Sequence, residues 1–228
     1  MAAPARAGPP FLSDDPDPTP LHEYEILFFA EGEPLRGDLS GSTGIDFNYG
    51  AAPDLQLTAA APLAFEEVGG ERAWGLGNVE LAAKLRVLHQ ETFGWDVAIF
   101  PRLFLPSASD LGDQHASFLL PVWVGRENDG WSTFGGGGCA INRGGDSQDY
   151  CLAGWAVTFD VTPRLNLGGE IFHQSADTEG GESTTTLGVG GTFDLNETLH
   201  LLGYLGTAPD HFAEADHTGW YASVLLTF

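Results

Sequence analysis

The sequence predicts an all-β fold, namely a single antiparallel up-and-down transmembrane β-barrel of about 12 strands. Three observations predict it. Apolar and polar residues alternate with period two along most of the chain, the connections between alternating segments are short and long in turn, and aromatic residues gather near the short connections. Period two is the repeat of a strand whose two faces meet different surroundings.

Composition limits the class of protein further. The chain has 228 residues, which suits one barrel domain, and 43% of them are hydrophobic. Asp and Glu number 32 against nine Lys and Arg, a formal net charge of −23, so binding to nucleic acid is not expected. No apolar run reaches the roughly 18 residues of a membrane helix, whereas barrel strands escape such a search because they alternate.

The alternation is clearest between residues 55 and 63 and between residues 79 and 87, where the odd positions are apolar. The same reasoning applied to the whole chain predicts twelve strands, with boundaries accurate to about two to four residues. They cover residues 22–31, 39–50, 54–63, 76–89, 93–105, 114–125, 129–141, 148–159, 164–175, 183–194, 198–207 and 218–228.

The connections between these strands form two classes. Short turns are expected at 51–53, 90–92, 126–128, 160–163 and 196–197, and longer loops at 32–38, 64–75, 106–113, 142–147, 176–182 and 208–217. Outer-membrane barrels have short periplasmic turns and longer extracellular loops. An even number of strands therefore places both ends of the barrel domain, residues 22–228, on the periplasmic side.

Aromatic residues on the apolar face are expected at similar depth near the short turns, as in a membrane-interface girdle. They are Tyr24, Tyr49, Trp95, Trp123, Trp131, Phe193 and Phe228. The alternative is a soluble barrel or sandwich with these rings in its core, but the opposite face carries charges that a packed core would not accept unpaired. The terminal Phe228 on an alternating strand is the usual ending of an outer-membrane barrel, where it serves as an assembly signal.

Residues 1–21 are expected to form a Pro-rich N-terminal strap outside the barrel wall, because prolines provide no hydrogen for a strand ladder. Within it, Ala5-Arg6-Ala7 resembles a cleavage site, so residues 1–7 are interpreted as the remnant of a signal peptide. The alternative is an Ala-rich terminus without that role. The strap is expected to enter the lumen, where its carboxylates at Asp14, Asp15 and Asp17 would meet the basic wall residues Lys84, Arg86 or Arg102. The alternative is a free periplasmic tail.

Several stretches resemble the outer-membrane transporter-like proteins of the meta-pathway of phenol degradation family. They are the opening Gly8-Pro9-Pro10-Phe11-Leu12-Ser13-Asp14-Asp15-Pro16-Asp17-Pro18, Tyr49-Gly50-Ala51-Ala52-Pro53-Asp54-Leu55, Gly75-Leu76-Gly77-Asn78-Val79-Glu80-Leu81, Phe100-Pro101-Arg102-Leu103-Phe104-Leu105-Pro106, Leu120-Pro121-Val122-Trp123 and Glu170-Ile171-Phe172-His173-Gln174. The resemblance covers essentially the whole chain. It implies an outer-membrane barrel that passes small hydrophobic or aromatic compounds, and it brings no catalytic residues.

The inward-facing residues are the candidates for function. Charged side chains inside a pore set its selectivity, and those predicted here are Glu25, Asp46, Glu80, Lys84, Arg86, Asp96, Arg102 and Glu170. The alternative is that they only pair with one another and stiffen the barrel. Aromatic residues are expected on the same inward face, where they would either form an apolar path for solutes or block the lumen. They are Phe29, Phe100, Phe104, Phe134, Trp155, Phe172 and Tyr204.

Two hairpins allow pairings to be predicted. A turn centred on residue 91 pairs Arg86 with Asp96 and Glu80 with Arg102, and leaves Lys84 as the free positive charge of the lumen. A register shifted by two residues would keep only diagonal contacts. A loop centred near residue 145 places Cys139 opposite Cys151, so a disulfide is expected in the oxidising envelope.

These patterns predict a monomeric, passive channel or transporter in the bacterial outer membrane, with a structural or envelope-interaction barrel of occluded lumen as the alternative. The expected partners are the lipid bilayer, lipopolysaccharide, the barrel assembly machinery and a small-molecule solute. Neither a metal site nor a cofactor is expected, and divalent-cation binding by the acidic loops at 176–182 and 208–217 stays open. Enzymatic activity is not expected, because His173 and Ser175 form no matched triad spacing.

Overall fold

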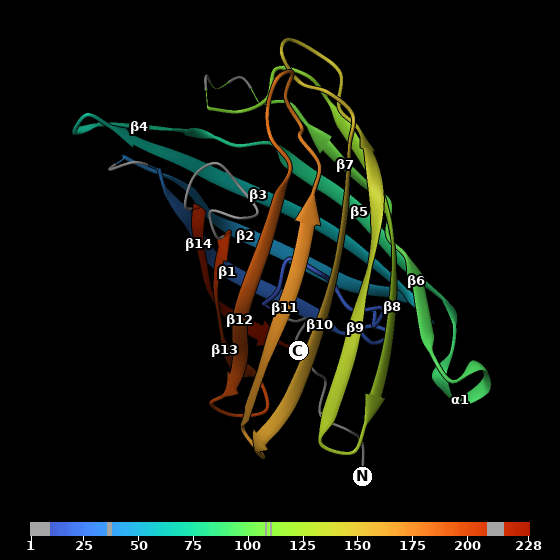
Figure 1. Ribbon diagram of the computed structural model, residues 1–228. Coiled ribbons are helices and arrows are strands. Elements are labelled where there is room, and N and C mark those ends of the chain that lie inside the picture. The colour runs from blue at the N-terminus through green and yellow to red at the C-terminus, as the bar shows by residue number, and fades with distance from the viewer. Residues whose placement is uncertain (1–9, 36–37, 108, 110, 209–216) are drawn as a thin grey trace.

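The computed structural model describes residues 10–35, 38–107, 109, 111–208 and 217–228. Within them, one antiparallel sheet closes on itself, because β1 pairs with both β2 and β14 (Figure 1). The strands are β1 (Tyr24–Leu35), β2 (Asp38–Ala52), β3 (Leu55–Val68), β4 (Glu71–Leu76), β5 (Val79–Leu88), β6 (Asp96–Ile99), β7 (Arg102–Leu105), β8 (Ser117–Asn128), β9 (Trp131–Ile141), β10 (Tyr150–Thr162), β11 (Leu165–Gln174), β12 (Thr184–Asp194), β13 (Leu199–Ala208) and β14 (His217–Thr227).

These segments make twelve barrel strands, as the sequence predicts. β4 and β5 both pair with β3 and form one strand interrupted at Gly77 and Asn78. β6 and β7 both pair with β5 and β8 and form another, interrupted at Phe100 and Pro101. Pro101 has no amide hydrogen to give to a ladder, which explains the second break. The closed, all-antiparallel barrel is confirmed.

Two of the predicted loops are largely strand. β1 and β2 continue through most of 32–38, and β3 and β4 through most of 64–75, so that the β3–β4 hairpin projects beyond the barrel (Figure 1). One predicted short turn instead holds the helix α1 (Gln90–Phe93), which ends at Gly94 with φ of 81°. In the described part of the chain no helix is long and apolar enough to cross a membrane.

The two faces of the barrel have opposite character. Large apolar side chains such as Phe28, Ile45 and Leu81 are exposed on the outside. Polar and charged side chains are buried on the inside, among them Glu25, Asn48, Gln56, Lys84 and Glu170. A soluble barrel would show the reverse arrangement, so this distribution fits a barrel with lipid outside and a polar lumen.

The aromatic residues predicted to face outward do so except at one position. Tyr24, Trp95, Trp131, Phe193 and Phe228 are exposed, and Tyr24 stacks on Tyr49 with 4.8 Å between ring centroids. Trp123, however, is only 2% exposed and shares the inward face of β8 with Leu119 and Pro121. The prediction failed there because β8 is apolar on both faces, so alternation does not reveal which face is inside.

The predicted disulfide is confirmed. Cys139 on β9 and Cys151 on β10 are directly opposed in the ladder and bonded to each other, 12 residues apart in sequence. Both lie at exposed positions on the outer face, beside the loop that joins the two strands. The bond therefore joins β9 and β10 near their connecting loop, and it makes no contribution to the lumen surface.

Candidate functional site

The strap crosses the lumen from one wall to the other. At its start, the backbone N–H groups of Leu12 and Ser13 donate to the Glu170 carboxylate of β11 at 3.1 and 2.6 Å. At its end, Thr19 donates through its N–H to Gln56 of β3 at 2.8 Å and through its hydroxyl to Glu25 of β1 at 3.1 Å. Residues 11–19 therefore lie inside the barrel and do not form a periplasmic tail. Residues 1–7 lie outside the described residues.

The middle of the strap binds the basic residues of β5. Lys84 Nζ lies 3.0 Å from Asp14 and 3.5 Å from Asp15, and only 4% of its side chain is exposed. Arg86 contacts Asp17 at 2.7 Å. The prediction of Lys84 as the free positive charge of the lumen is therefore wrong. The hairpin argument behind that prediction considered only the barrel wall. The separate expectation that the strap carboxylates meet basic wall residues is met, since Asp14 and Asp15 contact Lys84 and Asp17 contacts Arg86.

Arg102 and Glu80 are paired, but not by the predicted register. Arg102 Nε and Nη2 donate to the two Glu80 oxygens at 2.6 and 2.8 Å. In the ladder, however, Arg102 lies opposite Ala82, and Arg86 opposite Ala98, a shift of two residues. The helical turn α1 lengthens the connection and causes this shift, so the Glu80–Arg102 contact is diagonal.

The predicted Arg86–Asp96 pair is correspondingly weak. Its nitrogen–oxygen distance is 3.9 Å, whereas Arg86 donates to Asp54 at 3.0 and 3.1 Å. Asp96 accepts the N–H of Gln90 at 2.9 Å instead. Asp54 was not among the predicted site residues, because it lies in a turn and no local pattern marks it.

Asp46 differs from the other charged residues. It lies on the inner face of β2, beside Asn48, and one of its carboxylate oxygens is buried with no hydrogen-bond partner among the described residues. Together with Glu25 and Glu170, it leaves the lumen with more carboxylates than cations.

Aromatic side chains fill the middle of the lumen. Phe100, Phe134, Phe172 and Tyr204 are buried, and the strap residue Phe11 lies with its ring centroid 5.9 Å from both Phe134 and Tyr204. The cations also contact rings: Lys84 lies 5.2 Å from the Phe100 centroid, and Arg102 5.3 Å from that of Phe104. Phe29 stacks on Tyr221 at 6.4 Å.

Trp155 is not part of this group. It is 40% exposed on the outer face of β10, lies edge-on to Trp95 at 6.2 Å and donates to the Thr133 hydroxyl at 2.7 Å. Val157 and Phe159, which lie on the same face of β10, are also apolar. This run of apolar residues is the sequence signal that could have placed Trp155 on the outer face. Trp123 takes the inward position that the sequence reasoning assigned to Trp155.

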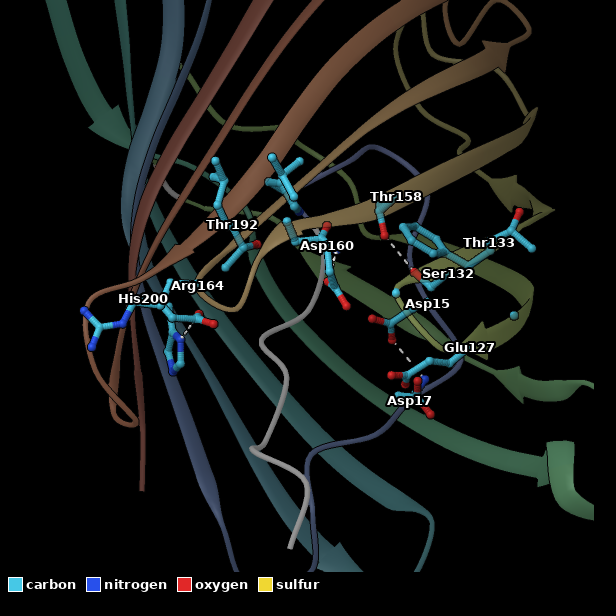
Figure 2. A pocket seen from close by; sticks show the side chains of 18 of the residues that line it. Asp15, Asp17, Glu127, Ser132, Thr133, Thr158, Asp160, Arg164, Thr192 and His200 are labelled. Carbon is cyan, nitrogen blue, oxygen red and sulfur yellow. Dashed lines mark hydrogen bonds and ion pairs between the residues drawn. The ribbon is translucent and has the colours of Figure 1, made fainter. Parts of the chain in front are cut away.

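Two cavities lie at opposite ends of the lumen. The larger, about 1070 Å³, is bounded by strap residues and by residues of the short turns near 126–132 and 160–166. Figure 2 shows Asp15, Asp17 and Glu127 on one side of it, with Arg164 and His200 on the other. The smaller, about 270 Å³, lies at the long-loop end between Asn78, Asp113 and Asp177.

Comparison with solved structures identifies the type of barrel. An outer membrane channel from Pseudomonas putida F1 has a TM-score of 0.70 with 14% identity over 94% of this chain and 98% of its own. The NanC porin has a TM-score of 0.63 with 8% identity over 88% and 98%. The fold is that of an outer-membrane β-barrel. At such identities the likeness shows the fold alone.

A third solved structure is also similar, whereas the search for a sequence family found none. The CymD monoaromatic hydrocarbon channel has a TM-score of 0.50 with 9% identity over 91% of this chain and 88% of its own. No family model and no curated protein matches the sequence. The resemblance to the phenol-degradation family therefore remains a proposal. The apolar exterior of this outer-membrane barrel nevertheless suits the bacterial outer membrane.

Residues that could bind a metal ion or take part in hydrolysis already make other contacts. His89, Glu91 and Asp96 offer ligand atoms within 4.8 Å of one another, but His89 already contacts Asp54 at 3.3 Å. His173 hydrogen-bonds to Thr185, while Ser175 Oγ accepts the Cys151 N–H. Most of the acidic loop at 208–217 lies outside the described residues.

Proposed function

We propose that this outer-membrane barrel is a passive channel for small, hydrophobic or aromatic compounds. The observation that carries the proposal is that the two ends of the lumen hold cavities while aromatic rings are buried in the section between them. Aromatic walls bind flat apolar solutes by contact area and edge-to-face packing. Diffusion along such a wall needs no energy coupling.

Two likenesses support the choice of solute. The family resemblance of the sequence implies passage of hydrophobic or aromatic compounds, and the CymD neighbour is a monoaromatic hydrocarbon channel. The phenylalanine and tyrosine rings that surround Phe11 provide a surface of suitable chemistry. In this proposal the barrel is a monomer, contacts lipopolysaccharide at its outer rim and is inserted by the barrel assembly machinery.

One observation favours a second candidate, a structural barrel with an occluded lumen. Ser13 of the strap is completely buried, and both ends of the strap are hydrogen-bonded to the wall. A strap held in this way could close the lumen permanently, and the barrel would then act through its outer surface and loops.

Liposome swelling distinguishes the two candidates. Proteoliposomes are diluted into resorcinol or into arabinose, with protein-free liposomes as the reference. The channel predicts faster swelling than the reference and a preference for resorcinol that falls several-fold in Phe134→Ala, with Phe118→Ala on the outer face as control. Rates equal to the reference for both solutes would favour the occluded barrel.

A further inference from the structure

The strap changes the charge of the lumen section it crosses. Without it, the basic residues of this wall would be Lys84, Arg86 and Arg102, of which Arg102 is neutralised by Glu80 and Arg86 by Asp54. Lys84 would remain a bare cation beside the Phe100 ring. At Lys84 the wall alone would therefore present a positive charge, within a lumen whose wall also carries the carboxylates of Glu25, Asp46 and Glu170.

The strap supplies more carboxylates than this site has cations. Asp14, Asp15 and Asp17 face Lys84 and Arg86, and both cations are in contact with at least one of the three. Because Arg86 also contacts Asp54, the assembled section carries an excess of negative charge. Within residues 10–21 there is no basic residue that would offset it.

The two cavities that lead to this section are acidic as well. Eight carboxylates and two guanidinium groups line the larger cavity. Asp113 and Asp177 line the smaller one, which has no basic side chain among its described residues. A narrow passage lined by one sign of charge concentrates counter-ions and excludes co-ions.

We propose that the strap covers the positive charge of Lys84 with an excess of carboxylates, which makes this lumen selective for cations and suits it to small organic cations such as aromatic ammonium ions. This inference rests on the proposed channel function and names the charge class of its solute. The aromatic rings near Phe100 add cation–π attraction for such a solute. Aromatic carboxylates would be disfavoured.

The test is the permeability ratio of K⁺ to Cl⁻, taken from reversal potentials in planar bilayers across a KCl gradient. Asp14→Asn, Asp15→Asn and Asp17→Asn together keep the size of the strap and remove its charge. The control removes the same charge from the projecting hairpin, by Glu66→Gln, Glu67→Gln and Glu71→Gln. Proteoliposome uptake of benzylammonium and benzoate provides a second readout on the same proteins.

We expect the unaltered protein and the control to prefer K⁺, and the strap variant to lose this preference by roughly tenfold, since Lys84 is then unopposed. Adding Lys84→Met to the strap variant should restore part of the K⁺ preference, because the wall carboxylates are then no longer opposed by Lys84. A Cl⁻ preference in the unaltered protein would overturn this inference and leave the channel proposal standing. The same would follow from an unchanged ratio of K⁺ to Cl⁻ permeability in the strap variant. Absence of both conductance and uptake in every protein would overturn the channel proposal, and this inference with it.

Discussion

At the scale of single residues, the Glu80–Arg102 pair joins two wall strands inside the lumen through both carboxylate oxygens. Two charge-assisted hydrogen bonds join the groups, and the side chains are only 11% and 31% exposed. Glu80→Gln leaves Arg102 without its counter-charge. We expect the free energy of unfolding to fall by about 1–2 kcal/mol, a value reduced for the partial exposure of Arg102. Urea unfolding in lipid vesicles, followed by tryptophan fluorescence, measures it.

A matched exposed pair serves as the control. Arg143 donates to Asp149 at 2.8 Å in the loop between β9 and β10, with side chains 76% and 43% exposed. The Arg143 hydrogen bond holds the pKa of the Asp149 carboxyl below its usual range. Asp149→Asn should nevertheless leave stability unchanged, because solvent screens the pair. If Glu80→Gln and Asp149→Asn lowered the free energy of unfolding equally, burial would add nothing to the Glu80–Arg102 contact.

At the scale of elements, the strap depends on glycines in the wall. A side chain at Gly50 would place its Cβ 1.9 Å from the Pro20 oxygen, and at Gly125 2.6 Å from Pro16 Cδ. We therefore expect Gly50→Ala and Gly125→Ala to displace the strap without unfolding the barrel. A protease that cleaves after acidic residues should then cut at Asp14, Asp15 or Asp17 several-fold faster.

A third glycine tests the specificity of that effect. At Gly203 of β13, an added Cβ would have its nearest neighbour at 3.9 Å, so Gly203→Ala should not change strap cleavage. Circular dichroism must show the same strand content in all three variants. If the Gly50 and Gly125 variants were cleaved no faster than the Gly203 variant, the strap would not be seated on these glycines.

At the scale of the whole molecule, the barrel closes at its last residue. Phe228 and Tyr24 exchange both backbone hydrogen bonds at 2.9 Å, and the Phe228 ring is 61% exposed. Because the backbone makes the closure, Phe228→Ala should refold normally in vesicles. In cells, however, we expect its folded fraction in the outer membrane to fall several-fold, since the ring is the proposed assembly signal. Heat-modifiable migration in gels measures both fractions, with Phe193→Ala as control.

Much of the architecture was predictable from the sequence. The alternation of side chains along residues 55–63 and 79–87 is local, so the strands, their number and the inward position of Glu80, Lys84 and Arg102 followed from it. The Cys139–Cys151 bond followed from the length of one hairpin. Such features depend on neighbours in sequence, and period two records them directly.

The tertiary structure decided what a local pattern does not contain. Trp123 lies on the inner face of β8, a strand that carries apolar residues on both sides, so that alternation alone does not reveal its inner face. The turn α1 shifts its hairpin by two residues. Above all, the sequence offered Lys84, Arg86 and Arg102 as partners of the strap carboxylates, and only the assembled barrel decided that Asp14 and Asp15 meet Lys84, since these residues are distant in the chain.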